Sequence, residues 1–358
     1  MAIEDYLEID GSFGEGGGSI LRIGSAFSIL YKKPIHIKNI RANRPKPGLR
    51  LQHLKGLQAL ANLTNSSLSE CNVGTKEITL LPSRSSKSSL NINIETAGNI
   101  GLLLQPIQIA CLGFNEPHRI DILINGGGTF GAWAPSLNYL EDVTYKIFRN
   151  HNYKIDIDIQ KHGFYPKGGA SVKCTVYPPI KEIKSILLTK LGKIDLIQGE
   201  IIITNQLKET KVGERIKKSA EVQIKKKTHL DVKINYKYVN SSSPGVGLTL
   251  WACSDLGAII SSGTILGEKK ISSEQLGKVA VNALFKYIHN EIPVDNYLSD
   301  QLIPFMGICK EPSRIKVLDI TSHTKTNLEL IKLFSNRNYK ISKENKSYII
   351  EMERLVNY

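Results

Sequence analysis

The sequence contains few cysteines, and no two of them stand close enough to form a metal site or a redox motif. The five occur at positions 71, 111, 174, 253 and 309, at least 40 residues apart. Structural zinc sites and thiol redox motifs place two cysteines two residues apart, so neither is indicated. An odd number also fits poorly with a disulfide framework. We therefore expect free thiols that are buried.

Long hydrophobic runs are also missing. The most apolar stretch, residues 100–114, is interrupted by Gln105, Pro106 and Gln108, whereas a transmembrane helix needs about 20 apolar residues. The first five residues are acidic rather than basic and lead into no apolar segment, unlike a secretory signal. These features predict a cytoplasmic protein that has no membrane partner.

Negative charge is scarce relative to positive charge. The chain has 47 Lys and Arg residues against 33 Asp and Glu residues, a formal net charge of +14. Such an excess raises the local concentration of polyanions and favours nucleotide or nucleic-acid partners. A solvated basic surface with no such partner explains the charge equally well.

Strand and helix patterns alternate along most of the chain, which has 358 residues and is long enough for more than one core. Between residues 182 and 274 the composition becomes richer in Lys and Ile. We predict an α+β fold in which repeated βαβ-type units (strand pairs and helices) form a core of residues 1–181 and 275–358, with a smaller inserted α/β domain at residues 182–274. Expected strands are residues 6–9, 35–40, 78–82, 90–94, 120–124 and 314–319, and expected helices are residues 19–30, 51–63, 97–112, 135–150, 275–288 and 324–334.

A glycine-rich segment, residues 10–18, lies between the first expected strand and helix. Glycines there let backbone amides approach a phosphate, and the helix N-terminus adds positive potential. A carboxylate in such a loop suits a metal bridging to phosphate, so Glu15 is a candidate ligand and Arg22 a candidate phosphate clamp. The spacing matches neither a Walker A loop nor a dinucleotide-binding fingerprint. A simple tight turn remains the alternative.

Basic residues cluster in the run IRANRPKPGLRLQH, residues 40–53. Two prolines and a glycine restrict its backbone, so the cations are displayed at set angles. Fixed arginines such as Arg41 and Arg44 suit bidentate phosphate binding. For an isolated run of this kind a solvated basic loop would be the preferred interpretation, but its closeness to the glycine-rich segment favours phosphate.

A histidine, His323, stands in the segment SHTKTN at the expected start of a C-terminal helix. The positive potential at a helix N-terminus favours a neutral imidazole, which is the form that can attack phosphorus. Taken alone, such a histidine is more often a surface or capping residue.

Taken together, these segments resemble the RNA 3′-terminal phosphate cyclase family over nearly the whole chain. The matching segments are, in order, DGSFGEGGGSILR, IRANRPKPGLRLQHL, ETAGNIGLLLQ, NGGGTFGAWAPS, HGFYPKGGA, VDNYLSDQLIPFM and SHTKTN. The resemblance implies a core of repeated α+β units with a smaller inserted domain. One departure is Leu51, which stands where many members have proline before the glutamine of the second helix.

The resemblance also implies an activity. Its members use ATP and a divalent metal, Mg or Mn, to convert an RNA 3′-phosphate end to a 2′,3′-cyclic phosphate through a covalent histidine–AMP intermediate and an RNA(3′)pp(5′)A intermediate. On this basis His323 is the expected nucleophile and Glu15 the expected metal ligand. The expected phosphate ligands are Arg22, Arg41 and Arg44, the other polar residues of the nucleotide site are Gln52, Gln105, Asp300 and Gln301, and the adenine neighbours are Pro135 and Tyr297.

Two other functions remain open. One is the cyclase-like branch of the same family, which acts in ribosome biogenesis without catalysis and lacks the nucleophilic histidine. The other is an enolpyruvyl transferase, which also presents arginines to phosphate but has no use for a histidine such as His323. The sequence leaves the oligomeric state open, a homodimer included, and it suggests that the basic stretch at residues 215–237 guides RNA by its charge.

Overall fold

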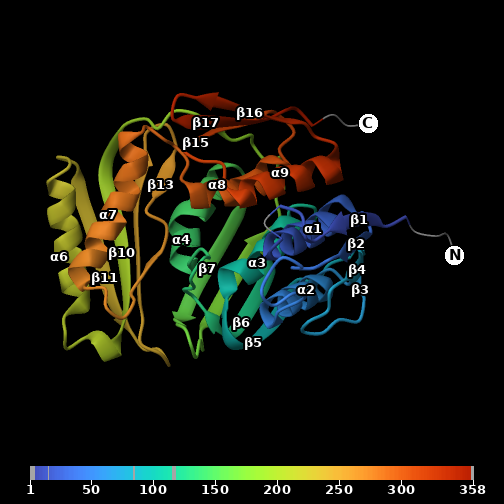
Figure 1. Ribbon diagram of the computed structural model, residues 1–358, viewed down its shortest axis with the longest axis horizontal. Helices are drawn as coiled ribbons and strands as arrows, with labels where there is room; N and C mark the ends of the chain where they lie inside the picture. Colours follow the sequence, from blue (N-terminus) through green and yellow to red (C-terminus); the bar gives the residue numbers. More distant parts are fainter. Residues whose placement is uncertain (1–4, 15, 84, 115–117, 356–358) are drawn as a thin grey trace.

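The computed structural model describes residues 5–14, 16–83, 85–114 and 118–355. These residues form an α+β fold of four mixed sheets with helices packed between and against them. Figure 1 shows the sheets and the helices that separate them. The predicted fold class is confirmed.

The first unit is a four-stranded sheet with two helices. It consists of β1 (Leu7–Asp10), α1 (Gly18–Tyr31), β2 (Ile35–Lys38), α2 (Leu51–Leu63), β3 (Ser67–Leu68) and β4 (Ile78–Leu81). The strand order is β1-β2-β4-β3, in which β1 and β2 are parallel and the other neighbours antiparallel. The alternating burial of β2 and β4 places their isoleucines and leucines beneath the helices.

The second unit repeats this topology with longer strands. It consists of β5 (Ser89–Asn99), α3 (Ile100–Cys111), β6 (Ile120–Gly128), α4 (Leu137–Tyr139), the π-helix η1 (Leu140–Thr144), α5 (Tyr145–Asn150), β7 (Lys154–Lys161) and β8 (Ser171–Tyr177). The order is β5-β6-β8-β7, again with one parallel pair, β5 and β6, followed by antiparallel pairs.

The third unit follows the same order, although its first strand is far from the others in sequence. It consists of β9 (Leu187–Leu188), α8 (Asn296–Met306), β15 (Ser313–Val317), α9 (Ser322–Ser335), β16 (Tyr339–Glu344) and β17 (Ser347–Met352). The order β9-β15-β17-β16 again begins with a parallel pair. The three units therefore share one strand order, although the sequence itself shows only weak similarity between them.

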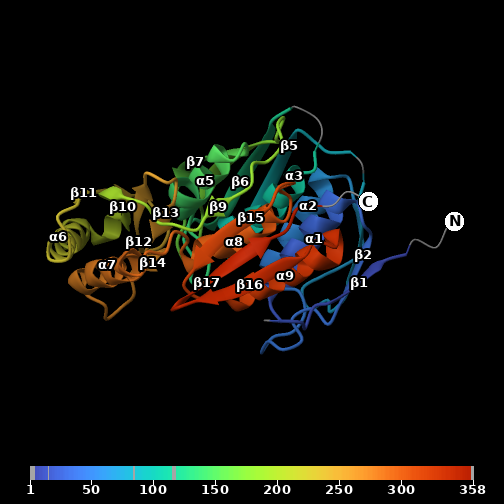
Figure 2. The same cartoon turned by 90° about the horizontal axis from the view of Figure 1, so that it is seen from above.

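A further sheet is inserted between β9 and α8. It is built from β10 (Ile194–Thr204), the 3-10 turn η2 (Asn205–Leu207), α6 (Val212–Lys225), β11 (Asp231–Val239), β12 (Val246–Ser254), β13 (Ile259–Ser261), β14 (Ile265–Leu266) and α7 (Ser273–His289). The order is β11-β10-β12-β13, with β14 also paired to β12. Figures 1 and 2 place this module at one end of the molecule, with α6 and α7 side by side. The predicted end of the inserted domain, residue 274, falls in the first turn of α7. The predicted domain boundaries stay a prediction.

The helices of the three units meet in the middle of the molecule. Helix α1 contacts α2, α3 and α9, and α8 contacts α9 (Figure 2). Phe27 of α1 packs edge-on against Phe334 of α9, with ring centroids 5.6 Å apart. This contact joins the two ends of the chain, and buried apolar area of this kind is the main driving force for folding.

Most expected elements are present, with instructive differences. Helix α2 has the predicted limits, and α3 is helical despite Pro106. Helix α9 begins at Ser322 rather than at residue 324, and α8 was not predicted. The prediction of buried free thiols is confirmed for Cys111, Cys174 and Cys309, whereas Cys71 is only partly buried and Cys253 is exposed. None of the helices described here is long and apolar enough to cross a membrane.

Candidate functional site

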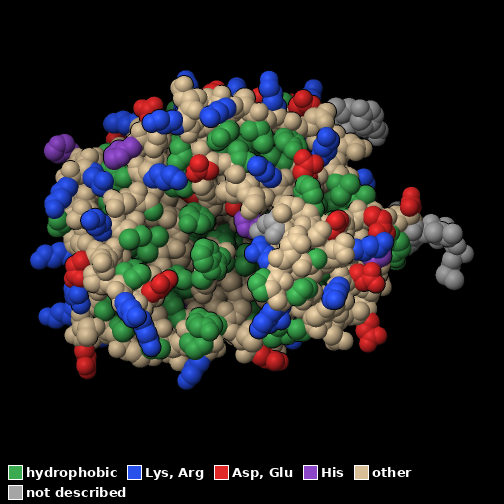
Figure 3. Space-filling view, viewed as in Figure 1, with side chains coloured by type: hydrophobic (Ala, Val, Ile, Leu, Met, Phe, Trp, Pro, Cys, Tyr) green, Lys and Arg blue, Asp and Glu red, His purple; other side chains and the backbone are tan. Residues whose placement is uncertain are grey.

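A central cleft of about 570 Å³ lies where the helices of the three units converge. Figure 3 shows a hollow near the middle of the face it views, with Lys and Arg side chains close to its rim. We call this space the central cleft. The predicted site residues that line it are Arg22, Arg41, Arg44, Gln105, Pro135, Tyr297, Asp300, Gln301 and His323.

The first turns of three helices face the central cleft. Helix α1 contributes Gly18 and Ser19, α8 contributes Asn296 and Tyr297, and α9 contributes His323. A helix N-terminus presents unbonded N–H groups and the equivalent of about half a positive charge. The N-termini of α1 and α9 therefore favour anionic groups such as phosphates, whereas the first N–H groups of α8 are bonded to the carboxylate of Asp295.

His323 lies in the first turn of α9, and its side chain is half-buried in the cleft wall. The turn is fixed by Thr321, whose hydroxyl oxygen accepts a hydrogen bond of 2.9 Å from the backbone N–H of Thr324. The sequence predicted this histidine just before the helix. Its place inside the first turn gives the ring a firmer attachment, because the backbone there is already helical.

Asp300 of α8 ties that turn to the neighbouring helix. Its Oδ1 accepts hydrogen bonds from the hydroxyls of Thr321, at 2.6 Å, and Thr324, at 2.9 Å. Its backbone carbonyl accepts a third bond, of 3.1 Å, from the side-chain amide of Asn327. The first turn of α9, which carries His323, is therefore held by α8 through both Thr321 and Asn327.

The guanidinium groups of the cleft are also oriented by the fold. The Nε of Arg22 donates a hydrogen bond of 3.0 Å to Oε1 of the buried Gln105, which fixes the plane of the guanidinium group. Arg41 has a φ of +57°, a conformation that residues other than glycine rarely adopt. Its loop is closed by a backbone bond of 2.8 Å from Gly48 to Ile40.

His53 is a member of the site that the sequence grouped with the basic residues but did not assign. Its Nδ1 accepts a hydrogen bond of 3.2 Å from the backbone N–H of Arg50 at the start of α2. Burial, together with the charges of Arg22, Arg41 and Arg50, lowers the pKa of His53 to about 3. The ring is therefore neutral. Its hydrogen bond to Arg50 fixes the start of α2, where Leu51 stands in place of a proline that would restrict the backbone.

The glycine at the first position of α1, Gly18, has a steric reason. A β-carbon at Gly18 would lie 2.4 Å from Nε2 of His53 and 2.8 Å from Nη1 of Arg22. No larger residue fits without moving one of these side chains. The glycine-rich segment is thus a requirement of close packing as well as of backbone access to a ligand.

Asp295, the N-cap of α8, joins this helix to α4 and to the inserted module, and it was not predicted. Its wholly buried carboxylate accepts hydrogen bonds from the backbone N–H groups of Tyr297 and Ser261 and from the hydroxyl of Tyr139. Burial raises its pKa to about 6. An aspartate before a helix is the ordinary N-cap signal, which could have found it.

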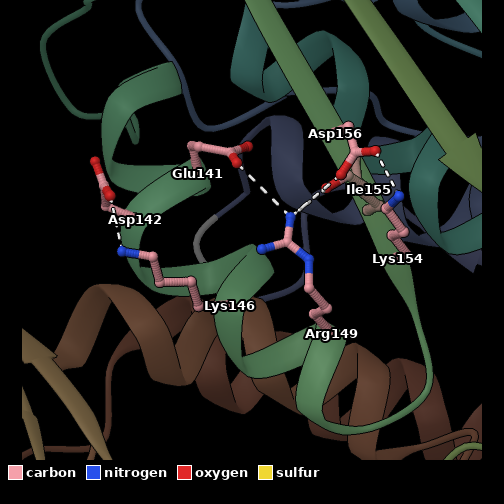
Figure 4. Close-up of polar contacts among 7 residues, drawn as sticks. All are labelled: Glu141, Asp142, Lys146, Arg149, Lys154, Ile155 and Asp156. Carbon is pink, nitrogen blue, oxygen red and sulfur yellow. Dashed lines mark hydrogen bonds and ion pairs between the residues drawn. The ribbon is translucent and has the colours of Figure 1, made fainter.

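The wall that carries Pro135 continues into η1 and α5. Arg149 lies between Glu141 and Asp156 (Figure 4), with Nη2 3.7 Å and 3.2 Å from their oxygens, and Lys146 pairs with Asp142 at 2.9 Å. Half-exposed pairs of this kind each contribute at most about 1 kcal/mol. The pair between Arg149 and Asp156 attaches α5 to β7. The π-helix η1, which precedes α5, is of a type often found beside functional sites.

One of the two remaining predicted residues, Gln52, stands apart from this lining. Gln52 lies behind the cleft, where its Oε1 accepts a bond of 3.3 Å from the backbone N–H of Asn99 at the start of α3. Glu15, the expected metal ligand, lies outside the described residues. The roles assigned to the individual residues stay predictions.

Comparisons with known proteins agree on one family. The sequence model of the family described as RNA 3′-terminal phosphate cyclase matches residues 13–341. Proteins named RNA 3′-terminal phosphate cyclase from Pyrococcus abyssi and Thermococcus gammatolerans are 36% and 34% identical, over 94% and 95% of this chain and 96% and 95% of their own. One from Archaeoglobus fulgidus is 32% identical over 92% of this chain and 95% of its own.

Proposed function

The chain belongs to the RNA 3′-terminal phosphate cyclase family, and on that premise we propose that it uses ATP to convert the 3′-terminal phosphate of RNA to a 2′,3′-cyclic phosphate. The observation that carries the proposal is the common position of His323 and three arginines on one cleft. A nucleophile beside several guanidinium groups, of which that of Arg22 is fixed by Gln105, suits attack on a phosphate.

The proposed reaction has three steps. A ring nitrogen of His323 attacks the α-phosphorus of ATP, and the bond to pyrophosphate breaks as the N–P bond forms. An oxygen of the RNA 3′-phosphate then attacks the same phosphorus, which gives RNA(3′)pp(5′)A and returns the imidazole. Finally the 2′-hydroxyl attacks the 3′-phosphorus, loses its proton and displaces AMP.

The cleft residues suit the charge that develops in these steps. Negative charge spreads over the oxygens of a pentavalent phosphorus, so guanidinium groups and helix N-termini stabilise the transition state more than the ground state. Arg22 is already oriented by Gln105, and so little reorganisation is needed when the substrate binds. The last step is intramolecular and carries no large entropic penalty.

A divalent cation, Mg²⁺ or Mn²⁺, would neutralise part of the triphosphate charge when bound. Among the described residues of the lining, Asp300 is the carboxylate, and its Oδ1 already accepts two hydroxyl hydrogen bonds. The described lining therefore suits phosphate more than metal, and the metal site of this proposal rests on Glu15.

The inserted module is proposed to guide the RNA by charge. Arg215 pairs with Glu274 at 2.8 Å and Lys217 lies 3.7 Å from Glu221, but the lysines at the end of α6 are exposed. Exposed lysines attract a phosphate backbone in a way that weakens with salt. Deletion of residues 215–237 without loss of RNA affinity at low salt would remove this part of the proposal.

Incubation of the purified protein with ATP labelled at the α-phosphate tests the proposal. An acid-labile, alkali-stable protein–AMP adduct is expected for the wild type and for His229→Ala, a matched control because His229 is exposed and lies outside the cleft. No adduct is expected for His323→Ala. An adduct in that variant would overturn the nucleophile, and no adduct in the wild type would favour the non-catalytic cyclase-like branch.

A further inference from the structure

Trp133 is the most exposed large hydrophobic residue on the rim of the central cleft. Its side chain is 100% exposed, whereas Trp251, the second tryptophan of the chain, is 6% exposed. Trp133 also has a φ of +64°, which is unfavourable for a bulky residue. A solvated indole in a strained backbone contributes nothing to the core, so its position calls for another explanation.

The loop that carries Trp133 is held at both ends. Phe130 stacks on Phe164, with ring centroids 4.9 Å apart and planes 10° from parallel. The backbone N–H of Leu137 donates a bond of 3.0 Å to the carbonyl of Thr129, which closes the loop. The exposed ring therefore projects from a fixed support.

The second end of the loop is anchored to the inserted module and to α3. The backbone N–H of Ser136 donates a bond of 3.2 Å to the hydroxyl of Thr264, and the side-chain amide of Asn99 donates one of 3.4 Å to the carbonyl of Pro135. A rigid aromatic surface loses little conformational entropy when a flat ligand stacks on it.

We propose that Trp133 is the stacking platform for the 3′-terminal base of an RNA whose terminal phosphate lies at His323. The inference rests on the proposed function and adds the subsite that receives the RNA end. Every base offers a flat face, so stacking on an indole suits an enzyme that accepts RNA ends of any sequence. Exposed Arg44 and Lys46, in the loop after β2, supply positive charge for the RNA backbone.

The adenine of ATP is assigned to a different surface. Tyr297 is backed by Gly263 and by the buried ring of Tyr139, with which it makes an edge contact at 6.4 Å. In RNA(3′)pp(5′)A the two nucleosides are joined through a pyrophosphate, so each needs its own platform within reach of the phosphate centre. Trp133 and Tyr297 both line the cleft that contains His323, and they come from different elements, the loop before α4 and the first turn of α8.

Fluorescence provides a test that does not depend on turnover. In a Trp251→Phe background Trp133 is the sole tryptophan, because the chain has two. Titration with a short single-stranded RNA that ends in a 3′-phosphate should quench and shift its emission. Quenching by ATP alone, with no further change on adding RNA, would assign the ring to the nucleotide and overturn the proposal, as would no change with either ligand.

Kinetics of Trp133 variants, with RNAs that have or lack the 3′-terminal base, test whether that base is the one that stacks on the ring. Trp133→Ala should raise the KM for RNA about tenfold and leave the rate of self-adenylation with ATP unchanged, whereas Trp133→Phe should retain most of the affinity. An RNA whose terminal nucleotide lacks its base should bind wild type and Trp133→Ala equally. Ile180→Ala, which truncates another exposed apolar residue outside the cleft, serves as the control.

The outcomes separate this inference from the proposed function. If the wild type forms no AMP adduct but RNA still quenches Trp133, the proposed reaction fails and the RNA subsite stands. If adduct formation and cyclisation are normal in wild type and in Trp133→Ala, at every RNA concentration, the subsite is wrong and the reaction stands.

Discussion

The ring of Tyr297 lies directly against Gly263: a β-carbon added to Gly263 would come within 2.3 Å of Cε2 of the tyrosine. Gly263 belongs to the inserted module, between β13 and β14, whereas Tyr297 opens α8. The inserted module thus determines where one wall of the central cleft stands. This relationship gives the first of four predictions.

Gly263→Ala should displace Tyr297 and raise the KM for ATP in self-adenylation. Gly257→Ala is a matched control, because Gly257 also has a positive φ, +84° against +67°, but a β-carbon there would meet nothing within 4 Å. Both variants should lose about 1 kcal/mol of unfolding free energy from backbone strain. Equal KM values in the two variants would contradict the assignment of Tyr297 to the nucleotide.

Thr321→Ala should slow formation of the AMP adduct and destabilise the protein by about 1 kcal/mol, because the N-cap of α9 and a bond to Asp300 are lost together. Thr321→Ser keeps the hydroxyl and should behave like wild type. Thermal unfolding and single-turnover adenylation measure the two effects. A slow Thr321→Ser variant would show that the methyl group, and not the cap, positions His323.

Arg22→Lys should lower kcat/KM for adenylation tenfold or more, since an ammonium group cannot both bond Gln105 and bind phosphate in a bidentate manner. Arg119→Lys provides the comparison: Arg119 forms an exposed ion pair with Asp121 at 3.1 Å, outside the cleft, and its replacement should have no effect. Steady-state kinetics at limiting ATP measure kcat/KM for both variants. An unchanged Arg22→Lys enzyme would remove this arginine from the phosphate site.

His53→Gln should make the stability of the protein less sensitive to acid. The unfolded histidine has a pKa of 6.5 and the folded one about 3, so the unfolded chain binds the proton first. The contribution to stability is complete above pH 6.5 and is lost as the pH falls toward 3, by about 1.4 kcal/mol for each pH unit in that window. Glutamine at this position can still accept the bond from the N–H of Arg50.

Denaturant unfolding at pH 7 and pH 5 measures this difference. The wild type should lose about 2 kcal/mol more than His53→Gln over that range. The pKa of His162 is also lowered by burial, to about 4, but that residue is present in both proteins and cancels in the comparison. Identical pH profiles would mean that His53 is not held neutral by the fold.

The local elements were largely readable from the sequence. Helix α2 runs from Leu51 to Leu63 as its apolar periodicity predicts, and the positions of α1, α3 and α7 were found within a few residues. Helix α8, which contains Pro304, was missed. The family was also visible in the motifs, since glycine, proline and arginine positions in order are specific over a whole chain.

The partners of the site residues were not readable. Nothing in the sequence places Gln105 on Arg22, Asp300 on Thr321 or Gly263 on Tyr297, because these pairs are separated along the chain. They meet only when α1 packs on α3, α8 packs on α9 and the inserted module meets α8. The neutral state of His53 likewise depends on burial and on the charges of Arg22, from α1, and of Arg41 and Arg50, from its own segment.

The sequence by itself determined which chemical groups this protein carries and, except for those on α8, on which helices and turns they stand, because propensity and periodicity act over a few residues. Only the tertiary structure decided that the first turns of α1, α8 and α9 open into the same cleft, and that Trp133 stands exposed on its rim. The physical reason is that long-range packing, not local preference, brings together groups that lie some 300 residues apart, as Ser19 and Asn327 do.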